Sequence, residues 1–344
     1  MAAVFAKTGK GGKDGSKFLE AVRFPIEEIN KQGGLLGKHI ELIEFDNKSE
    51  PLTSKISAVK AVKAGVSAVI GAVWSSNSLA MAPVLQKAGI PMISPASTNP
   101  DVTLVGNYIF RTCFIDPFQG AVMANFAIQD LGAKTAVVLN NANSSYSVGL
   151  AKVFTQRFRE LGGKIPWEGD YLDEETDFSL LLKKIKTIKP DVGFVPGRST
   201  DSALIISQAR KMGLSAIFLG GDSWNENMYD YAGKGLHGNY CSDHWHPKIP
   251  DKVSQDFVKQ YKEKYGGVFG RHALCYDTVH ILADAIRRAN SSEPDHIRDA
   301  LAETKNFHGV TGKITMNKNG DPVKPAVILK FDKGTVIYVR SVEP

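Results

Sequence analysis

Two stretches decide the fold: Gly71-Ala72-Val73-Trp74-Ser75-Ser76-Asn77-Ser78 and Ile93-Ser94-Pro95-Ala96-Ser97-Thr98-Asn99-Pro100. Each is an apolar run that ends abruptly in small hydroxyl residues, and the first leads into a helix-like segment, 79–88. A strand that stops at a Ser/Thr cluster opening a helix leaves backbone N–H groups and hydroxyls facing one point. Such a point suits a carboxylate or another anion. Two of them, after successive strands, predict a small polar ligand at the carboxyl edge of a parallel sheet.

The rest of the chain repeats this alternation of strand and helix. Repeated units with apolar strands predict an α/β fold, in which parallel sheets are covered by helices on both faces. Strands are expected over 2–6, 39–45, 68–73, 91–93, 108–112, 135–139, 192–195 and 216–219, and a closing hairpin over 326–331 and 335–339. Helices are expected over 54–64, 79–88, 119–131, 148–161, 203–212 and 271–290.

Length and charge narrow the classes of protein to consider. The 344 residues are too many for one ordinary core, so two domains are expected. The net charge of +6 comes from scattered lysines without a Lys/Arg block, which argues against a nucleic-acid partner. No apolar run approaches the ~20 residues that span a bilayer. The chain enters a strand-like run almost at once, without a secretory signal peptide. It is therefore either cytoplasmic or exported with its signal removed.

The cysteines and histidines do not form a metal site in the sequence. Cys113, Cys241 and Cys275 are odd in number, far apart and without CxxC spacing. Buried thiols are expected, although a single Cys113–Cys241 or Cys241–Cys275 bridge stays open in an oxidising compartment. His244 and His246 could offer two ligands on one strand face, but no third ligand has suitable spacing. No metal is therefore predicted.

Two further motifs fail the tests for catalysis or nucleotide binding. The segment 8–15 is rich in glycine and lysine, but it lacks the GxxxxGK[ST] pattern and carries Asp14 after Gly12-Lys13. It is predicted to be a flexible turn near the ligand edge. Ser223 lies in Gly-Asp-Ser-Trp-Asn, which is not the GxSxG nucleophile elbow. We therefore expect no cofactor, no catalytic residue and no enzymatic activity.

Three polar side chains follow other predicted strands. Asp222 comes directly after the apolar run 216–219 and two glycines, where a carboxylate can hold an ammonium group. A helix cap near Asn225 is an equally good explanation of this carboxylate. Tyr146 and Arg198 also stand just past strands. Together with the serine clusters, these side chains predict a trap for a zwitterion.

With these residues in view, the chain resembles the type I periplasmic solute-binding proteins of the branched-chain amino acid transporter class. The resemblance covers nearly the whole length, and the order and spacing of its matching stretches make it specific. These stretches are Glu27–Lys38, Ile93–Pro100, Phe110–Cys113, Tyr276-Asp277 and Phe307–Ile314. The resemblance implies two Rossmann-like lobes joined by three hinge crossings, with the ligand enclosed in the cleft between them. The lobes are predicted to be 1–117 with 248–325, and 118–247 with 326–344.

The resemblance also implies roles for single residues. Ser75 and Thr98 fall where the family binds the α-carboxylate of an amino acid. The carbonyl of Ala96 falls where the ammonium group is bound. Tyr146 matches the aromatic residue of the second lobe, and Asp222 matches the acidic residue that pairs with the ammonium group.

Three residues depart from the leucine-type pattern. Trp74 stands where those proteins carry a small cysteine, so their disulfide is not expected here. Its ring would narrow the side-chain pocket or stack on the ligand. Asp14 stands where an aromatic residue is common, and Arg198 could hold a second carboxylate. Ser76 and Ser97 complete the predicted binding site. These departures question simple leucine binding.

The expected function is a monomeric, extracytoplasmic receptor for an amino acid or a related small carboxylate, which it delivers to an ABC transporter permease. It would be periplasmic or anchored at the cell surface, with its export signal removed. A ligand-sensing regulatory domain of the same fold is the alternative. An enzyme on an α/β scaffold ranks lower, because neither a nucleophile elbow nor a phosphate loop is present.

Overall fold

The computed structural model describes residues 1–268 and 270–344. The chain forms two compact units: unit 1 is Met1–Ile115 with His244–Lys324, and unit 2 is Asp116–Asp243 with Pro325–Pro344. The predicted lobes placed residues 244–247 with the second part, whereas they belong to unit 1. The reason is Trp245, which is 1% exposed in the core of unit 1 and donates its indole N–H to Ser254 Oγ (2.8 Å).

Unit 1 is built on a five-stranded, entirely parallel sheet of order β2-β1-β3-β4-β5. The interior strand β1 (Ala2–Phe5), which lies between β2 and β3, has no solvent exposure along its length. Side chains alternate across a strand, so Ala3 and Phe5 enter one apolar core while Ala2 and Val4 enter the other. The sheet is therefore covered on both faces, as the apolar strands predict. The other strands are β2 (Ile43–Asp46), β3 (Val69–Gly71), β4 (Met92–Ser94) and β5 (Ile109–Arg111).

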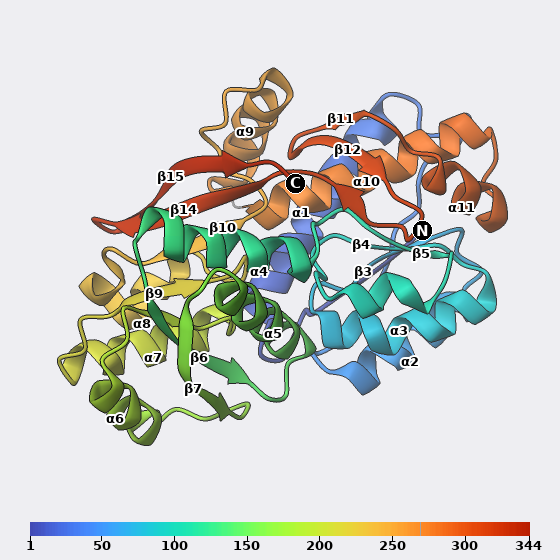
Figure 1. The fold of residues 1–344 in the computed structure, drawn as a ribbon. Coiled ribbons are helices and arrows are strands. Elements are labelled where there is room, and N and C mark those ends of the chain that lie inside the picture. The colour runs from blue at the N-terminus through green and yellow to red at the C-terminus, as the bar shows by residue number, and fades with distance from the viewer. Residues whose placement is uncertain (269) are drawn as a thin grey trace. The chain divides into compact units, whose positions relative to one another are not determined.

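The helices of unit 1 supply the two covering layers. Residues of α1 and α10 belong to one core, and residues of α2 and α3 belong to the other (Figure 1). The helices are α1 (Gly12–Lys31), α2 (Pro51–Lys63), α3 (Ser75–Ala88), the 3₁₀ helix η1 (Pro100–Val105), α9 (Lys252–Tyr265), α10 (Gly270–Ala289) and α11 (Pro294–Ala302).

A small antiparallel sheet of unit 1 explains two of the stretches that carry the resemblance. It comprises β11 (Phe307–Gly309), β12 (Gly312–Met316) and β13 (Pro322–Val323). Asp277 on α10 accepts from the backbone N–H groups of Val310 (2.7 Å) and Thr311 (2.9 Å), and from the Thr311 hydroxyl (2.6 Å). Burial raises the pKa of Asp277, while nearby Lys324 and these hydrogen bonds oppose that rise. These hydrogen bonds therefore connect two of the stretches that carry the resemblance, Tyr276-Asp277 and 307–314.

Unit 2 is built on a seven-stranded sheet of order β15-β14-β10-β9-β8-β6-β7. Within this sheet, the five strands β10, β9, β8, β6 and β7 pair in parallel with their neighbours. The predicted closing hairpin is confirmed as the antiparallel pair β14–β15, which is red in Figure 1, and β14 pairs antiparallel with β10. The strands are β6 (Thr135–Asn141), β7 (Lys164–Tyr171), β8 (Val192–Phe194), β9 (Ile217–Gly220), β10 (Tyr240–Asp243), β14 (Ala326–Asp332) and β15 (Thr335–Val342). The helical elements are α4 (Asp116–Asn125), the π segment η2 (Phe126–Asp130), α5 (Ser145–Glu160), α6 (Ser179–Ile188), α7 (Ser199–Lys211), η3 (Glu226–Met228), α8 (Tyr229–Ala232) and η4 (Gly233–Leu236).

Several helices begin earlier than the sequence predicts. The α3 helix starts at Ser75 rather than at residue 79, so the serine cluster forms its first turn. The α1 helix was not among the predicted helices, and it starts at Gly12, so residues 12–15 are not part of the predicted flexible turn. An added Cβ at Gly15 would lie 1.9 Å from the carbonyl oxygen of Ala6, so only glycine allows α1 to lie this close to the end of β1.

Cys113, Cys241 and Cys275 are buried thiols, as the cysteine count predicts. His244 packs against Phe114, with ring centroids 3.7 Å apart. Across 1–268 and 270–344, no group of three or more metal-binding side chains is arranged to hold an ion. In the same residues, no helix is both long and apolar enough to cross a bilayer.

Candidate functional site

The start of α3 forms the first part of the candidate site. Trp74 precedes the helix, and Ser75 is its first residue. The first N–H groups of a helix have no partner one turn earlier, so this end attracts an anion. The Ser75 side chain is 2% exposed, and its oxygen accepts from the backbone N–H of Asn99 (3.2 Å). This bond ties the helix start to the loop after β4 and leaves the hydroxyl proton of Ser75 to donate.

Ser97 holds the two loops together. Its hydroxyl lies 2.7 Å from that of Ser78 and donates toward the carbonyl oxygens of Ala72 and Val73 (both 3.1 Å). Its backbone N–H donates to Ser94 Oγ (2.9 Å). All of these groups are buried or nearly so, and Ser97 is 0% exposed. The Ser97 side chain therefore has a structural task, and its contact with a ligand stays a prediction.

Arg111, at the end of β5, fixes the backbone conformation of the loop that follows β4. The guanidinium is fully buried and donates to the carbonyl oxygens of Ser97, Asn99 (2.9 Å) and Pro100 (3.3 Å). Its Nε lies 2.7 Å from Asp321 Oδ1, so the positive charge is balanced within unit 1. Because the carbonyls of Ser97 and Asn99 both bond to Arg111, the backbone of Thr98 between them is held in place.

Thr98 carries a buried polar atom that the protein does not satisfy. The residue is 0% exposed, and its hydroxyl oxygen has no hydrogen-bond partner among the described residues. Buried polar groups in native proteins are almost always paired, so this hydroxyl is a candidate for a ligand contact. Ala96, two residues earlier, is 6% exposed and packs with Cys113 and Leu274.

Three further predicted site residues, Trp74, Ser76 and Asp14, lie at the start of α3 or of α1 in unit 1. An added Cβ at Gly11 would lie 3.1 Å from Cζ2 of Trp74, so the indole rests on the backbone of the loop before α1. Trp74 and Ser76 are both half-buried. Asp14 is half-buried in the first turn of α1, where its charge also favours the helix dipole.

In unit 2, Tyr146 lies in the first turn of α5, after β6. Its hydroxyl donates to Ser223 Oγ (3.3 Å), and the Ser223 hydroxyl donates to the Gly197 carbonyl (2.5 Å). An added Cβ at Gly221 would lie 2.3 Å from the Tyr146 oxygen. Glycine at 221 therefore lets the aromatic side chain reach the loop that carries Asp222.

Asp222 is 4% exposed and follows β9. Its carboxylate accepts from the Gln119 amide nitrogen (3.3 Å), and its backbone N–H donates to the Gln119 amide oxygen (3.3 Å). The helix cap offered as an alternative role is filled by Asn225, whose side chain accepts from Asn227 N–H. A buried carboxylate held in this way can bind a cation.

Arg198 occupies the N-cap position of α7 without a side-chain cap, and its guanidinium pairs with Asp173, which follows β7 (2.9 Å). Asp173 also accepts from the Asn141 side chain (2.8 Å). Nearby, burial raises the pKa of Tyr171 well above its usual value, with the Asp201 charge as the next cause. A ligand carboxylate at Arg198 would therefore compete with Asp173.

Gln119, Arg111 and Ser223 were not singled out as site residues from the sequence. Arg111 lies in a stretch that carries the resemblance, and Ser223 was considered only as a nucleophile. Gln119 offered a weak signal, because it is an amide in a segment otherwise rich in apolar residues. Its full burial could not be inferred without knowing which face of α4 is covered.

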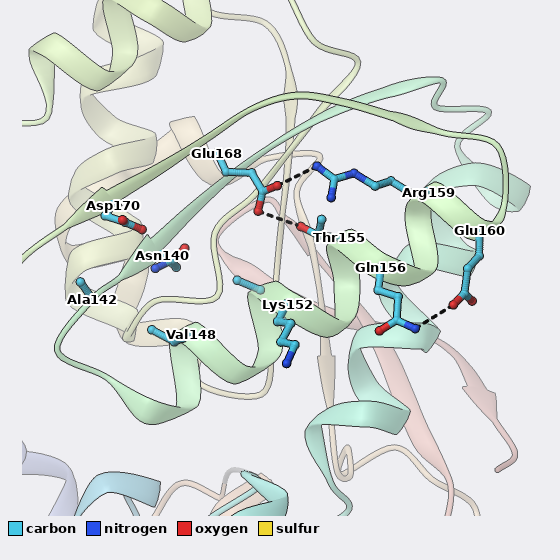
Figure 2. Close-up of a pocket in the computed structure, with 11 residues that line it drawn as sticks. Asn140, Ala142, Val148, Lys152, Thr155, Gln156, Arg159, Glu160, Glu168 and Asp170 are labelled. Carbon is cyan, nitrogen blue, oxygen red and sulfur yellow. Dashed lines mark hydrogen bonds and ion pairs between the residues drawn. The ribbon is translucent and has the colours of Figure 1, made fainter.

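A pocket of about 700 Å³ lies elsewhere on unit 2, between α5 and strands β6 and β7 (Figure 2). Figure 2 shows that its polar side chains pair with one another: Glu168 accepts from Arg159 (2.8 Å) and Thr155 (3.3 Å), and Glu160 accepts from Gln156 (2.9 Å). None of the predicted site residues lines this pocket. It is a feature of unit 2 separate from the predicted site residues.

Comparison with known sequences finds relatives along almost the whole chain. The sequence model of a family described as "Periplasmic binding protein" matches residues 1–335. The Leu/Ile/Val-binding protein homolog 1 of Brucella abortus (strain 2308) is 30% identical over 332 residues, covering 95% of this chain and 88% of the relative. A leucine-, isoleucine-, valine-, threonine- and alanine-binding protein of Pseudomonas aeruginosa is 28% identical, covering 91% of this chain and 84% of the relative.

Two solved structures share both fold and sequence with this chain. The leucine-binding protein LivK of Thermotoga maritima MSB8 is 36% identical with a TM-score of 0.96, covering 100% of this chain and 98% of that one. LivJ of Streptococcus pneumoniae, a branched-chain amino acid transporter substrate-binding protein solved with isoleucine, is 31% identical with a TM-score of 0.94, covering 100% and 99%. The predicted fold of helix-flanked parallel sheets is confirmed by this similarity.

Proposed function

The chain belongs to the periplasmic binding protein family, and on that premise we propose that it is a receptor that binds an amino acid and delivers it to an ABC transporter permease. The supporting relatives are named as amino-acid-binding proteins and match along nearly their whole length. The proposal includes an extracytoplasmic location, periplasmic or at the cell surface. It also includes action as a monomer and release of the ligand unchanged.

The observation that carries the proposal is the unsatisfied hydroxyl of Thr98 beside Ser75 and the start of α3. A hydroxyl at 0% exposure, a second hydroxyl with a proton to donate, and helix N–H groups together offer donors to one anionic group. A carboxylate has about four lone-pair sites and can accept from all of these. We therefore assign the α-carboxylate of the ligand to Ser75 and Thr98, and regard Ser97 as a structural residue.

We assign the ligand's ammonium group to Asp222, with Tyr146 beside it. The buried carboxylate would hold the ammonium group by charge-assisted hydrogen bonds, which are about twice as strong as neutral ones. Ala96 would contribute its backbone carbonyl to the same group. Burying a charged ligand is tolerable only because each of its charges gains several partners.

The ligand side chain is the part of the proposal that departs from the relatives. Trp74 puts a large aromatic ring at this edge of unit 1, and Asp14 puts a carboxylate in the first turn of α1. We propose an amino acid whose side chain fits against an aromatic ring, with a polar or cationic side chain favoured if Asp14 faces it. Arg198 would select for a second ligand carboxylate only if it released Asp173.

A thermal-shift screen of the standard amino acids tests this function. A ligand that binds only the folded protein raises its stability, by about 2.7 kcal/mol at a hundred times Kd. For each hit, the N-acetylated form removes the ammonium charge and the amide form removes the carboxylate, and we expect both to lose the shift. Mass spectrometry should recover the ligand unchanged. Absence of a shift with every amino acid would contradict the proposal.

The variant Asp222→Ala tests the assignment of the ammonium group. Removing a buried partner of the ligand's charge should weaken binding by about 2–5 kcal/mol in titration calorimetry. The matched control is Asp173→Ala, which removes a carboxylate of unit 2 that is already paired with Arg198. Unchanged affinity of Asp222→Ala for the best amino acid of the screen would refute the assignment.

A further inference from the structure

Gln119 is a fully buried amide that contacts three separate elements of unit 2. It lies on α4 and is 0% exposed. Its side chain reaches Asp116 at the start of the same helix, Asp222 after β9 and Ser242 on β10. Burying an amide costs free energy unless its hydrogen bonds are made, and here each end of the amide has partners.

The orientation of the amide is fixed by the chemistry of these partners. Its nitrogen donates to two carboxylates, Asp116 Oδ1 (2.9 Å) and Asp222 Oδ1 (3.3 Å). Its oxygen accepts from the backbone N–H of Asp222 (3.3 Å) and from the Ser242 hydroxyl (3.1 Å). A flipped amide would place its oxygen against both carboxylates, so one orientation is strongly preferred. Asp222 is thus held by its backbone and by its side chain through a single residue.

The loop around Asp222 is shaped to allow this contact. An added Cβ at Gly221 would lie 3.1 Å from the Gln119 amide oxygen and 2.3 Å from the Tyr146 hydroxyl oxygen. Glycine therefore admits both side chains to the loop at once. The other two partners of Gln119, Asp116 and Ser242, lie close to the boundaries of unit 2. Asp116 is the first residue of unit 2, and Ser242 stands one residue before the segment ends at Asp243. The same amide is therefore bonded to two of the places where the chain passes between the units.

We infer that Gln119 is the positioning residue of the ammonium site. It holds one oxygen of the Asp222 carboxylate, and thereby sets the direction in which the other faces the ligand. This inference rests on the proposed function, because it takes Asp222 as the partner of the ligand's ammonium group. A neutral amide suits this task better than a cation, since it orients the carboxylate without cancelling the charge that attracts the ligand.

The variant Gln119→Glu separates a positioning role from a merely structural one. It preserves shape but places a third carboxyl beside Asp116 and Asp222, the charged groups that contact this amide from α4 and the loop after β9. The phenol of Tyr146, on α5, also faces this loop, because an added Cβ at Gly221 would lie 2.3 Å from its hydroxyl oxygen. At pH 8 the added negative charge should repel Asp222 and weaken amino acid binding about 10- to 100-fold.

Lowering the pH should restore binding in this variant alone. Neighbouring carboxylates raise the pKa of an introduced carboxyl, so it takes up a proton as the pH falls toward 5.5. The protonated carboxyl offers one donor and one acceptor, as the glutamine amide does. The affinity relative to the natural protein should then return to within a few-fold. The control Gln208→Glu alters another amide of unit 2, which bonds Phe178 N–H and the Thr176 carbonyl. It should lower the melting temperature without changing ligand affinity at either pH.

Affinity is measured by titration calorimetry with the best amino acid of the screen, and folding by circular dichroism. The inference is overturned if folded Gln119→Glu binds as the natural protein does at pH 8, or if its loss of affinity is the same at both pH values. If that variant does not fold, Gln119→Met replaces it. A folded Gln119→Met with lowered affinity supports the inference, and one with unchanged affinity overturns it. Failure of the natural protein to bind any amino acid would instead refute the proposed function.

Discussion

The substitution Thr98→Val should change stability and ligand affinity in opposite directions. Valine has nearly the shape of threonine but replaces the hydroxyl by a methyl group. In the structure, the Thr98 hydroxyl is buried without a partner among the described residues. Removing it removes a desolvation penalty that the folded state otherwise carries. In the liganded protein, the same change deletes a hydrogen bond to the carboxylate.

The size of both effects follows from the burial of this atom. An unsatisfied buried polar group costs about 1–3 kcal/mol, so Thr98→Val should raise the free energy of unfolding by about 1 kcal/mol or more. A hydrogen bond to a charged group contributes about 1.5–3 kcal/mol, so the same variant should bind the amino acid about 10- to 100-fold more weakly. A threonine with a purely structural role would not give opposite signs.

Urea denaturation without ligand measures the first effect, and titration calorimetry measures the second. The matched control is Thr112→Val in the same unit, because the Thr112 hydroxyl is equally buried but lies 2.7 Å from the Thr278 hydroxyl. This control should lose about 1 kcal/mol of stability and keep its affinity. If Thr98→Val were less stable than the natural protein and bound the ligand normally, Thr98 would be a structural residue and the carboxylate assignment would fail.

Two further substitutions, at Arg111 and His272, test buried side chains of unit 1. Arg111→Met leaves the Asp321 carboxylate buried without its cation, so urea denaturation should show a loss of about 3–5 kcal/mol, and a loss below about 1 kcal/mol would contradict this role. Burial lowers the pKa of His272 to about 3, below its value of 6.5 when unfolded. The unfolded chain therefore binds the extra proton first, and stability should fall as the pH drops below about 6.5, by roughly 2 kcal/mol at pH 5. His272→Leu should remove this share of the acid sensitivity, and identical pH dependence in both proteins would rule it out.

The sequence predicts those elements whose side-chain pattern reflects their burial. β1 is apolar at every position because both of its faces are covered, and the continuous run identifies it. β7 (Lys164–Tyr171) was missed because it is an edge strand. Its exposed residues alternate with half-buried and buried ones, but Pro166 and Gly169 interrupt the apolar pattern. The early start of α3 was missed because Ser75 to Ser78 carry no apolar periodicity, although three of these four residues are buried.

The candidate site was predictable by residue type but not by the task of each residue. Ser97 and Thr98 are neighbours, both carry hydroxyls and both are fully buried. The hydroxyl of Ser97 bonds to the protein, whereas that of Thr98 has no partner among the described residues. The difference arises from Arg111, which follows Thr98 by 13 positions and draws the carbonyls on either side of it. No local pattern around residues 97 and 98 contains that information.

The two units differ in how their buried charges are paired, and this difference bears on the ligand contacts that we propose. In unit 1 the buried cation Arg111 is balanced by Asp321, and the groups proposed to bind the carboxylate, which are the hydroxyls of Ser75 and Thr98 and the first N–H groups of α3, are neutral donors. Neutral donors can bind a carboxylate without attracting every anion at long range. In unit 2 the buried carboxylate of Asp222 is oriented by the neutral amide of Gln119. A cation in the place of Gln119 would satisfy Asp222 internally, as Arg111 satisfies Asp321. Under the proposed function, a buried cation neutralised by the chain and a buried carboxylate held by an amide suit a zwitterionic ligand, because the ligand brings both of its own charges.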